Sequence, residues 1–146
     1  MRILLVEDDS HDVERVLRSF AEDNLIPRMN VEVVRDGQAA LDLLFGGDPG
    51  HEPALENGRR PHLILLDLGL PQIGGLEVLR RVKSERRTRL IPVVIISGLR
   101  DERDIAESYE LGVNSYIVKP TDDALFATVL RTMGLYWVRL NEPPSY

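Results

Sequence analysis

Short runs of apolar residues recur along the chain with the length of buried strands. Four of these runs are continuously apolar, and a fifth partly alternates with polar residues. Continuous runs are typical of strands covered on both faces of a sheet, whereas alternation is typical of an edge or half-covered strand. The pattern therefore predicts five strands, at Ile3–Val6, Val31–Val34, Leu63–Leu66, Val93–Ile96 and Tyr116–Val118.

Between these runs, apolar residues recur at the spacing of a helix. Intervals of three and four residues place side chains on one helix face, where they can pack against a sheet. The apolar stripes are Val13, Val16, Leu17 and Phe20; Ala40, Leu41, Leu44 and Phe45; Leu76, Leu79 and Val82; Ile105, Ala106 and Tyr109; and Leu125, Phe126, Val129, Leu130 and Met133. Residues that favour helix starts precede four stripes, namely Asp9 or Ser10, Asp36, Asp101, and Thr121 or Asp122.

The predicted elements alternate as strand then helix, five times over. Buried strands that alternate with helices form a parallel sheet with right-handed crossovers and helices on both faces. We therefore expect one doubly wound α/β domain with a five-stranded parallel sheet. The segment Gly46–Pro61 is rich in Gly and Pro and lacks any period, which predicts a long loop before the third strand.

Composition restricts the class of protein and its partners. A length of 146 residues fits one domain, and a net charge of −6 argues against nucleic acid as a partner. The absence of cysteine excludes disulfides and thiolate chemistry. The apolar run near the N-terminus is too short for a signal peptide or a membrane span, so we expect a cytoplasmic protein without membrane association. Nearly all basic residues are arginine, and the two lysines are Lys83 and Lys119.

Polar residues stand where the predicted strands end. The first strand runs into Glu7 and Asp8, the third into Asp67, the fourth into Ser97 and the fifth into Lys119. In a doubly wound sheet, ligands bind outside the carboxyl ends of the strands. We therefore expect these side chains to meet at one site.

The residue types at this edge match phosphoryl-transfer chemistry. Several carboxylates close together repel one another and favour a hard cation such as Mg²⁺, which binds carboxylate and phosphate oxygens. The ammonium of Lys119 and the hydroxyl of Ser97 could bind the oxygens of a transferring phosphoryl group. A carboxylate such as Asp67 can itself accept that group.

Each of these residues also has an ordinary structural explanation. The acids after the first strand could stabilise a helix start, and Asp67 could belong to a turn. Ser97 could be a cap, and Lys119 could be a surface lysine. Four such coincidences at four strand ends are a weaker explanation than one shared site.

Five sequence motifs occur in a fixed order around the predicted site. They are LLVEDD, LILLDLGLP, the pair Gly74–Gly75, VVIISG and YIVKP. Together they resemble the receiver domain of bacterial two-component response regulators, over Arg2 to about Arg139. The Gly46–Pro61 loop and the segment LYWV resemble single-domain response regulators associated with phytochrome-type kinases. The resemblance implies a flavodoxin-like (βα)5 sandwich with a receiver domain at 1–140, a tail at 141–146 and no output domain.

The resemblance also implies an acceptor and a metal site. Asp67 would be the phosphoacceptor, and Glu7 and Asp8 would match the acidic pair that organises Mg²⁺. Asp8 and Asp67 would be direct carboxylate ligands, and the main-chain carbonyl of Gly69 would complete the metal site. Many relatives carry a side chain where Gly69 stands, so the lifetime of an acyl phosphate on this chain is an open question.

Three further residues would make up the switch of such a domain. Ser97 matches the hydroxyl that moves toward the phosphoryl group, and Lys119 matches the lysine that pairs with it. Tyr116 matches the aromatic residue that turns inward on activation, although an aromatic residue on a strand is more often part of the core. A cis peptide bond is expected before Pro120.

The expected function is that of a phosphorylated signalling protein which acts through partners. The three histidines, His11, His51 and His62, lack the spacing of a metal site or of a base–nucleophile pair, and we interpret them as structural or surface residues. The phosphoryl group would therefore come from a histidine kinase, such as a bacteriophytochrome, or from a small phosphodonor. The protein would assist its own phosphorylation and dephosphorylation without being an enzyme for another substrate. The apolar residues Met133, Tyr136, Trp137 and Leu140 continue the last stripe, so a homodimer could form through the fourth helix to the C-terminal tail.

Two other functions stay open from the sequence. The first is a metal-dependent phosphatase or phosphotransferase for small molecules. Such enzymes use an aspartate nucleophile but generally need a second acid where Gly69 stands, and no segment here could cap a substrate. The second is an interaction module that is not phosphorylated, against which the intact set of Asp8, Asp67, Ser97 and Lys119 argues.

Overall fold

Five strands form one parallel sheet in the order β2-β1-β3-β4-β5. The computed structural model describes residues 1–22, 29–47 and 52–145. The strands are β1 Arg2–Val6, β2 Asn30–Val34, β3 Leu63–Leu66, β4 Val93–Ser97 and β5 Ser115–Val118. The helices are α1 Ser10–Ala21, α2 Gly37–Phe45, α3 Gly75–Ser84, α4 Glu102–Glu110, α5 Asp123–Leu135 and the π-helical segment η1 Tyr136–Leu140. This arrangement confirms the predicted doubly wound α/β fold.

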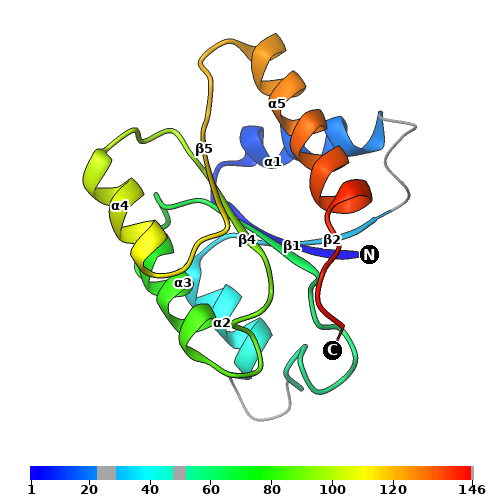
Figure 1. The fold of residues 1–146 in the computed structure, drawn as a ribbon, viewed down its shortest axis with the longest axis vertical. Helices are drawn as coiled ribbons and strands as arrows, with labels where there is room; N and C mark the ends of the chain where they lie inside the picture. Colours follow the sequence, from blue (N-terminus) through cyan, green and yellow to red (C-terminus); the bar gives the residue numbers. More distant parts are fainter. Residues whose placement is uncertain (23–28, 48–51, 146) are drawn as a thin grey trace.

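The helices cover both faces of the sheet. Figure 1 shows α1 and α5 on one side and α2, α3 and α4 on the other. Alternate residues of each strand enter one of two apolar clusters, because successive side chains of a strand point to opposite faces. In β1, for example, Leu4 and Val6 pack with α2 and α3, while Ile3 and Leu5 pack with α1 and α5. The three central strands are buried on both faces, which explains their continuous apolar runs.

Four helices begin at the acids that the sequence predicts. The side chain of each capping aspartate accepts a hydrogen bond from a backbone N–H of the first turn, at 2.7 to 2.9 Å. The capping residues are Asp9, Asp36, Asp101 and Asp122. Each such cap contributes about 1 kcal/mol to helix stability. At α1 the cap also fixes where the chain turns from β1 into the helix, directly beside the predicted site.

Four residues of the predicted apolar stripes are exposed, and one of them is the small Ala106 of α4. Leu17 of α1 is 38% exposed, and Leu125 of α5 and Tyr109 of α4 are each 53% exposed. Each lies at the edge of a stripe that is wider than the surface its helix buries. Helix α4 is the extreme case, because Ser108 is its only buried residue. The surface formed by α4 therefore carries apolar side chains without being part of the core.

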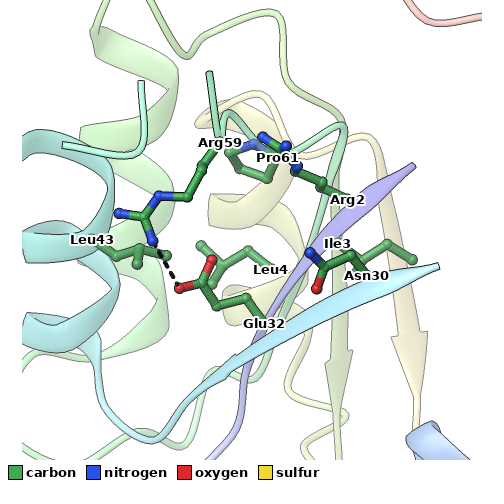
Figure 2. A pocket seen from close by; sticks show the side chains of 8 residues that line it. All are labelled: Arg2, Ile3, Leu4, Asn30, Glu32, Leu43, Arg59 and Pro61. Carbon is green, nitrogen blue, oxygen red and sulfur yellow. Dashed lines mark ion pairs between the residues drawn. The ribbon is translucent and has the colours of Figure 1, made fainter. Parts of the chain in front are cut away.

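The Gly46–Pro61 segment seals the end of the sheet opposite the predicted site. Residues 48–51 lie outside the described part of the chain, and the rest contains neither helix nor strand. Ala54 is completely buried, and its N–H donates to the carbonyl of Leu43 in α2 at 2.8 Å. Figure 2 shows Arg59 reaching from this segment toward Glu32 of β2, with which it forms an ion pair at 3.9 Å. The segment thus packs over the amino ends of β1 and β2.

Within the described residues, no helix combines the length and the apolar composition that a membrane crossing requires.

Lys83 at the end of α3 connects two loops at the end of the sheet opposite the predicted site. Its ammonium donates to the carbonyls of Arg89 at 3.1 Å and Ile91 at 2.8 Å, and to the side-chain oxygen of Asn114 at 3.0 Å. The same Asn114 oxygen accepts from the N–H of Val93 at the start of β4, at 2.9 Å. One cation therefore joins the α3–β4 connection to the turn before β5.

We predict that replacing Lys83 with Met destabilises the fold. The substitution approximately keeps the length of the side chain and removes all three hydrogen bonds, leaving the partly buried carbonyl oxygen of Ile91 without this donor. The free energy of unfolding in urea should fall by about 1–3 kcal/mol. The exposed Arg86 provides the matched control, since Arg86→Met also removes one cation close by. Equal stability of the two variants would contradict the role assigned to Lys83.

Candidate functional site

The carboxyl ends of four strands bring the predicted polar residues to one edge of the sheet. Glu7 follows β1, Asp67 follows β3, Ser97 ends β4 and Lys119 follows β5. The registers of β1 with β3 pair Val6 with Leu66, so the next residue of each strand is an acid. Glu7 is 3% exposed, Asp67 8% and Ser97 1%. Three of these polar side chains are therefore buried at one edge of the sheet.

Three carboxylates form a cluster at this edge. One oxygen each of Glu7, Asp8 and Asp67 lies within 4.8 Å of the others. Asp8 is exposed and the other two are buried, so the cluster is open to solvent on one side. A set of ligands made only of oxygen atoms, with excess negative charge, suits a hard divalent cation. The residues present therefore fit a site for Mg²⁺ or a similar ion.

Gly69 lies close to the Asp67 carboxylate. A β-carbon added at Gly69 would lie 3.7 Å from Oδ2 of Asp67, which is an ordinary van der Waals distance. The backbone at Gly69 could therefore carry a side chain without a clash. The absence of one leaves the space beside the Asp67 carboxylate open.

Lys119 contacts three acids. Its ammonium lies 2.9 Å from Oε2 of Glu7, 2.8 Å from Oδ2 of Asp12 and 3.7 Å from Oδ2 of Asp67. Burial by itself would lower the pKa of Lys119, but the hydrogen bonds to Asp12 and Glu7 outweigh it and raise that pKa above its ordinary value. Lys119 is therefore firmly cationic.

Asp12 is a residue of this site that no sequence pattern predicted. This residue lies in the first turn of α1, immediately before the buried Val13, and its side chain is 17% exposed. The available signal was its position, because an acid on the core side of a helix that starts at the carboxyl end of β1 must face the site. Its hydrogen bond to Lys119 spans 107 residues of sequence, which no local pattern predicts.

Ser97 and Tyr116 both contact the segment between β4 and α4. The hydroxyl oxygen of Ser97 accepts from the N–H of Leu99 at 3.2 Å, and the phenol of Tyr116 donates to the carbonyl of Leu99 at 3.0 Å. The N–H of Lys119 donates to the carbonyl of Ser97 at 2.7 Å, which joins the ends of β4 and β5. Tyr116 is half-buried, with its hydroxyl outside the core.

The expected cis peptide bond before Pro120 is not present. All peptide bonds in the described residues are trans. Trans is the lower-energy isomer for a bond before proline, by about 0.5–1 kcal/mol.

The family of the chain follows from a comparison with known protein families. Residues 3–131 match the model of the response regulator receiver domain. The chain belongs to this family. The match confirms the resemblance given by the sequence motifs, and it covers every residue of the site described above.

Individual relatives of this receiver domain include response regulators of phytochromes. Response regulator Rcp1 of Synechocystis sp. is 41% identical over 146 residues, covering 98% of this chain and 92% of Rcp1. The crystal structure of the Mn²⁺-bound form of Rcp1 matches with a TM-score of 0.88 over 99% of both chains, at 33% identity. The phosphorylated cyanobacterial phytochrome response regulator RcpA matches with a TM-score of 0.89 at 36% identity, over 99% of this chain and 98% of RcpA. The bacteriophytochrome response regulator RtBRR is 44% identical, with a TM-score of 0.69 over 98% of this chain and 83% of RtBRR.

We predict that Glu7 makes the metal-free receiver domain less stable as the pH rises. Burial raises the pKa of Glu7 to about 7, against the hydrogen bond from Lys119, which lowers it. Since the unfolded state has the lower pKa, the bound proton stabilises the fold fully below the ordinary pKa of about 4.5, and this stability is lost as the pH rises through about 7. Glu7→Gln removes the titration.

The measurement is urea unfolding with a chelator at about pH 5 and pH 8. Relative to Glu7→Gln, the wild type should lose stability between the two values. Glu14→Gln, an exposed change on α1 with the same loss of charge, should show a constant difference from the wild type. A constant difference for Glu7→Gln as well would show that Glu7 does not titrate in this range.

Proposed function

We propose that this receiver domain accepts a phosphoryl group on Asp67 from the phosphohistidine of a partner histidine kinase. The observation that carries the proposal is that Asp67 lies close to both an acid pair and an ammonium group. One oxygen each of Glu7 and Asp8 lies within 4.8 Å of an Asp67 oxygen. The ammonium of Lys119 lies 3.7 Å from Oδ2 of Asp67. A nucleophilic carboxylate in this setting has both parts needed to neutralise phosphoryl oxygens.

The reaction forms an acyl phosphate. An oxygen of the Asp67 carboxylate attacks phosphorus in line with the bond to the imidazole nitrogen. The new O–P bond forms as the P–N bond breaks, and the imidazole leaves with the electron pair and takes up a proton from solvent. Hydrolysis of the acyl phosphate by water restores Asp67, so the protein itself is not consumed.

Glu7, Asp8, Asp67 and the carbonyl of Gly69 would hold Mg²⁺ at this site. The ion supplies positive charge to the phosphoryl oxygens when bound. The acid cluster supports this assignment, and Rcp1 has a Mn²⁺-bound form. The open space beside Asp67 at Gly69 would give water ready access to the phosphoryl group. This access would influence the lifetime of the acyl phosphate.

The switch would use Ser97, Lys119 and Tyr116. The hydroxyl of Ser97 and the ammonium of Lys119 turn toward the new phosphoryl oxygens. When Ser97 moves, the N–H of Leu99 loses its acceptor, and the segment that also binds the phenol of Tyr116 is free to rearrange. Tyr116 then turns inward, and the surface around α4 and β5 changes for protein partners.

The kinase partner is a phytochrome-type histidine kinase, a bacteriophytochrome. Support comes from the relatives, since RcpA is a phytochrome response regulator and RtBRR a bacteriophytochrome response regulator. The likeness to RcpA extends over 99% of this chain.

The homodimer would form at the edge strand β5. This strand pairs only with β4 among the described residues and leaves one edge open. Beside it lies an apolar groove of about 410 Å³ between β5 and α5–η1. Its lining includes Ile117, Val129, Met133, Tyr136 and Trp137. An open strand edge next to apolar side chains favours pairing with a second copy of the chain.

Phosphorylation should depend on both Asp67 and Mg²⁺. We predict that a phosphorylated kinase or acetyl phosphate adds one phosphoryl group to the wild type, observed as a mass increase of the intact protein, and that a chelator prevents it. Asp67→Asn should abolish the increase, because an amide oxygen is a poor nucleophile. Asp42→Asn on α2 is the control and should be phosphorylated normally. A full mass increase in Asp67→Asn would overturn the proposal.

A charge in the groove should prevent dimerisation. We predict that the wild type has the mass of a dimer by light scattering at high concentration, with or without a phosphoryl mimic, and that Val129→Asp is monomeric. Leu125→Asp is the matched control, because Leu125 lies on the same helix, is 53% exposed and does not line the groove. A monomeric wild type at every concentration excludes the dimer.

A further inference from the structure

The ammonium of Lys119 is bound by two acids that are not the phosphoacceptor. Its distances of 2.8 Å to Asp12 and 2.9 Å to Glu7 are those of charge-assisted hydrogen bonds. Its distance of 3.7 Å to Asp67 exceeds the range of a hydrogen bond. In this structure, therefore, Lys119 is hydrogen-bonded to Asp12 and Glu7 but only ion-paired with Asp67.

Asp12 is itself held in place from the outer side. Its other carboxylate oxygen contacts the guanidinium of Arg15 at 3.3 Å. The same guanidinium contacts Asp123 at the start of α5 at 2.7 Å, and it lies 4.1 Å above the ring of Phe126. Asp12 therefore occupies a fixed place between α1 and α5, and it can retain Lys119 there without any change of backbone.

Of Asp12 and Asp67, only Asp12 accepts a hydrogen bond from the ammonium of Lys119. Glu7 lies next to both positions, so its hydrogen bond can persist through a small shift of the ammonium. A small cavity of about 10 Å³ adjoins Glu7, Asp12, Asp67 and Lys119 and is otherwise lined by six apolar residues. Because the ammonium is already within 3.7 Å of Asp67, only a short movement separates the two carboxylates.

We propose that Asp12 is a positioning residue that holds Lys119 off Asp67 until the phosphoryl group arrives. This inference rests on the proposed function. In the resting protein the Asp67 carboxylate stays free of a direct hydrogen bond from Lys119 and is available to attack phosphorus. In the phosphorylated protein Lys119 leaves Asp12 for the phosphoryl oxygens, and Asp12 keeps only Arg15. Breaking the contact with Asp12 thus opposes the phosphorylated conformation.

The test measures the affinity for beryllofluoride, a phosphoryl mimic, at saturating Mg²⁺ by calorimetry. Asp12→Asn should lower the dissociation constant by roughly three- to tenfold, since the mimic no longer competes with an ion pair. Asp12→Glu, which keeps the charge, should behave nearly as the wild type. Glu14→Gln on the exposed side of α1 removes one charge and should change nothing. Thermal unfolding checks that each variant is folded, and Asp12→Ser is a second variant without the charge.

The expected sign separates positioning from mere support of the fold. A residue that only stabilised the site would, on removal, leave the dissociation constant unchanged or raise it. An unchanged or weaker affinity of a folded Asp12→Asn or Asp12→Ser variant therefore overturns the inference.

A crystal structure of metal-free Asp12→Asn separates failure of this inference from failure of the proposed function. The distance from Nζ of Lys119 to Oδ2 of Asp67 should shorten to about 3 Å, and an unchanged distance overturns the positioning role. If the wild type binds no beryllofluoride at all, the proposed function fails, and this distance still decides whether Asp12 retains Lys119.

Discussion

One ammonium group holds together the carboxyl edge of the sheet. Lys119 lies 2.8 to 3.7 Å from three carboxylates, and its own side chain is 13% exposed. The parallel register of β1 and β3 brings Glu7 and Asp67 to neighbouring positions, so the fold itself forces two acids together. Desolvation of such charges costs several kcal/mol for each ion unless opposite charge is close by. Lys119 offsets this cost, and the raised pKa of Glu7 shows that it does so only in part.

The two lysines of the chain are both partly buried, but they differ in the chemistry of their partners. Lys83 donates to two carbonyls and an amide oxygen, and burial lowers its pKa to about 8. Lys119 donates to carboxylates, and its pKa is raised despite similar burial. The compact ammonium suits both places, because its three N–H donors leave from one nitrogen toward separate acceptors, whereas a guanidinium is larger and spreads its donors in a plane. The chain is rich in arginine, and its two lysines thus occupy two positions that need the geometry of an ammonium group.

The fold could be predicted from the sequence because each signal was local. Strand ends, helix caps such as Asp36 and Asp122, and the alternation of elements all depend on neighbouring residues. The position of the site followed, since strand ends in a parallel sheet must converge. The exposure of Leu17 and Leu125 could not be predicted in this way, because it depends on how much of each helix the rest of the fold covers. Asp12 was missed for a related reason. Its partner Lys119 is distant in sequence, and no sequence motif contains both residues.

Lys119 is also where two connections from the site begin. Its side chain contacts Asp12, which shares Arg15 with Asp123 at the first turn of α5. Its backbone N–H contacts the carbonyl of Ser97, whose hydroxyl binds the segment that receives the phenol of Tyr116.

These two connections would carry different changes. Release of Asp12 by Lys119 leaves this carboxylate paired with Arg15 alone and so alters the electrostatics between α1 and α5 without requiring backbone movement. Loss of the Ser97–Leu99 hydrogen bond instead frees backbone and changes the shape of the surface near α4. A single phosphoryl group on Asp67 would therefore redistribute charge on one face of the sheet and change the geometry of the other face.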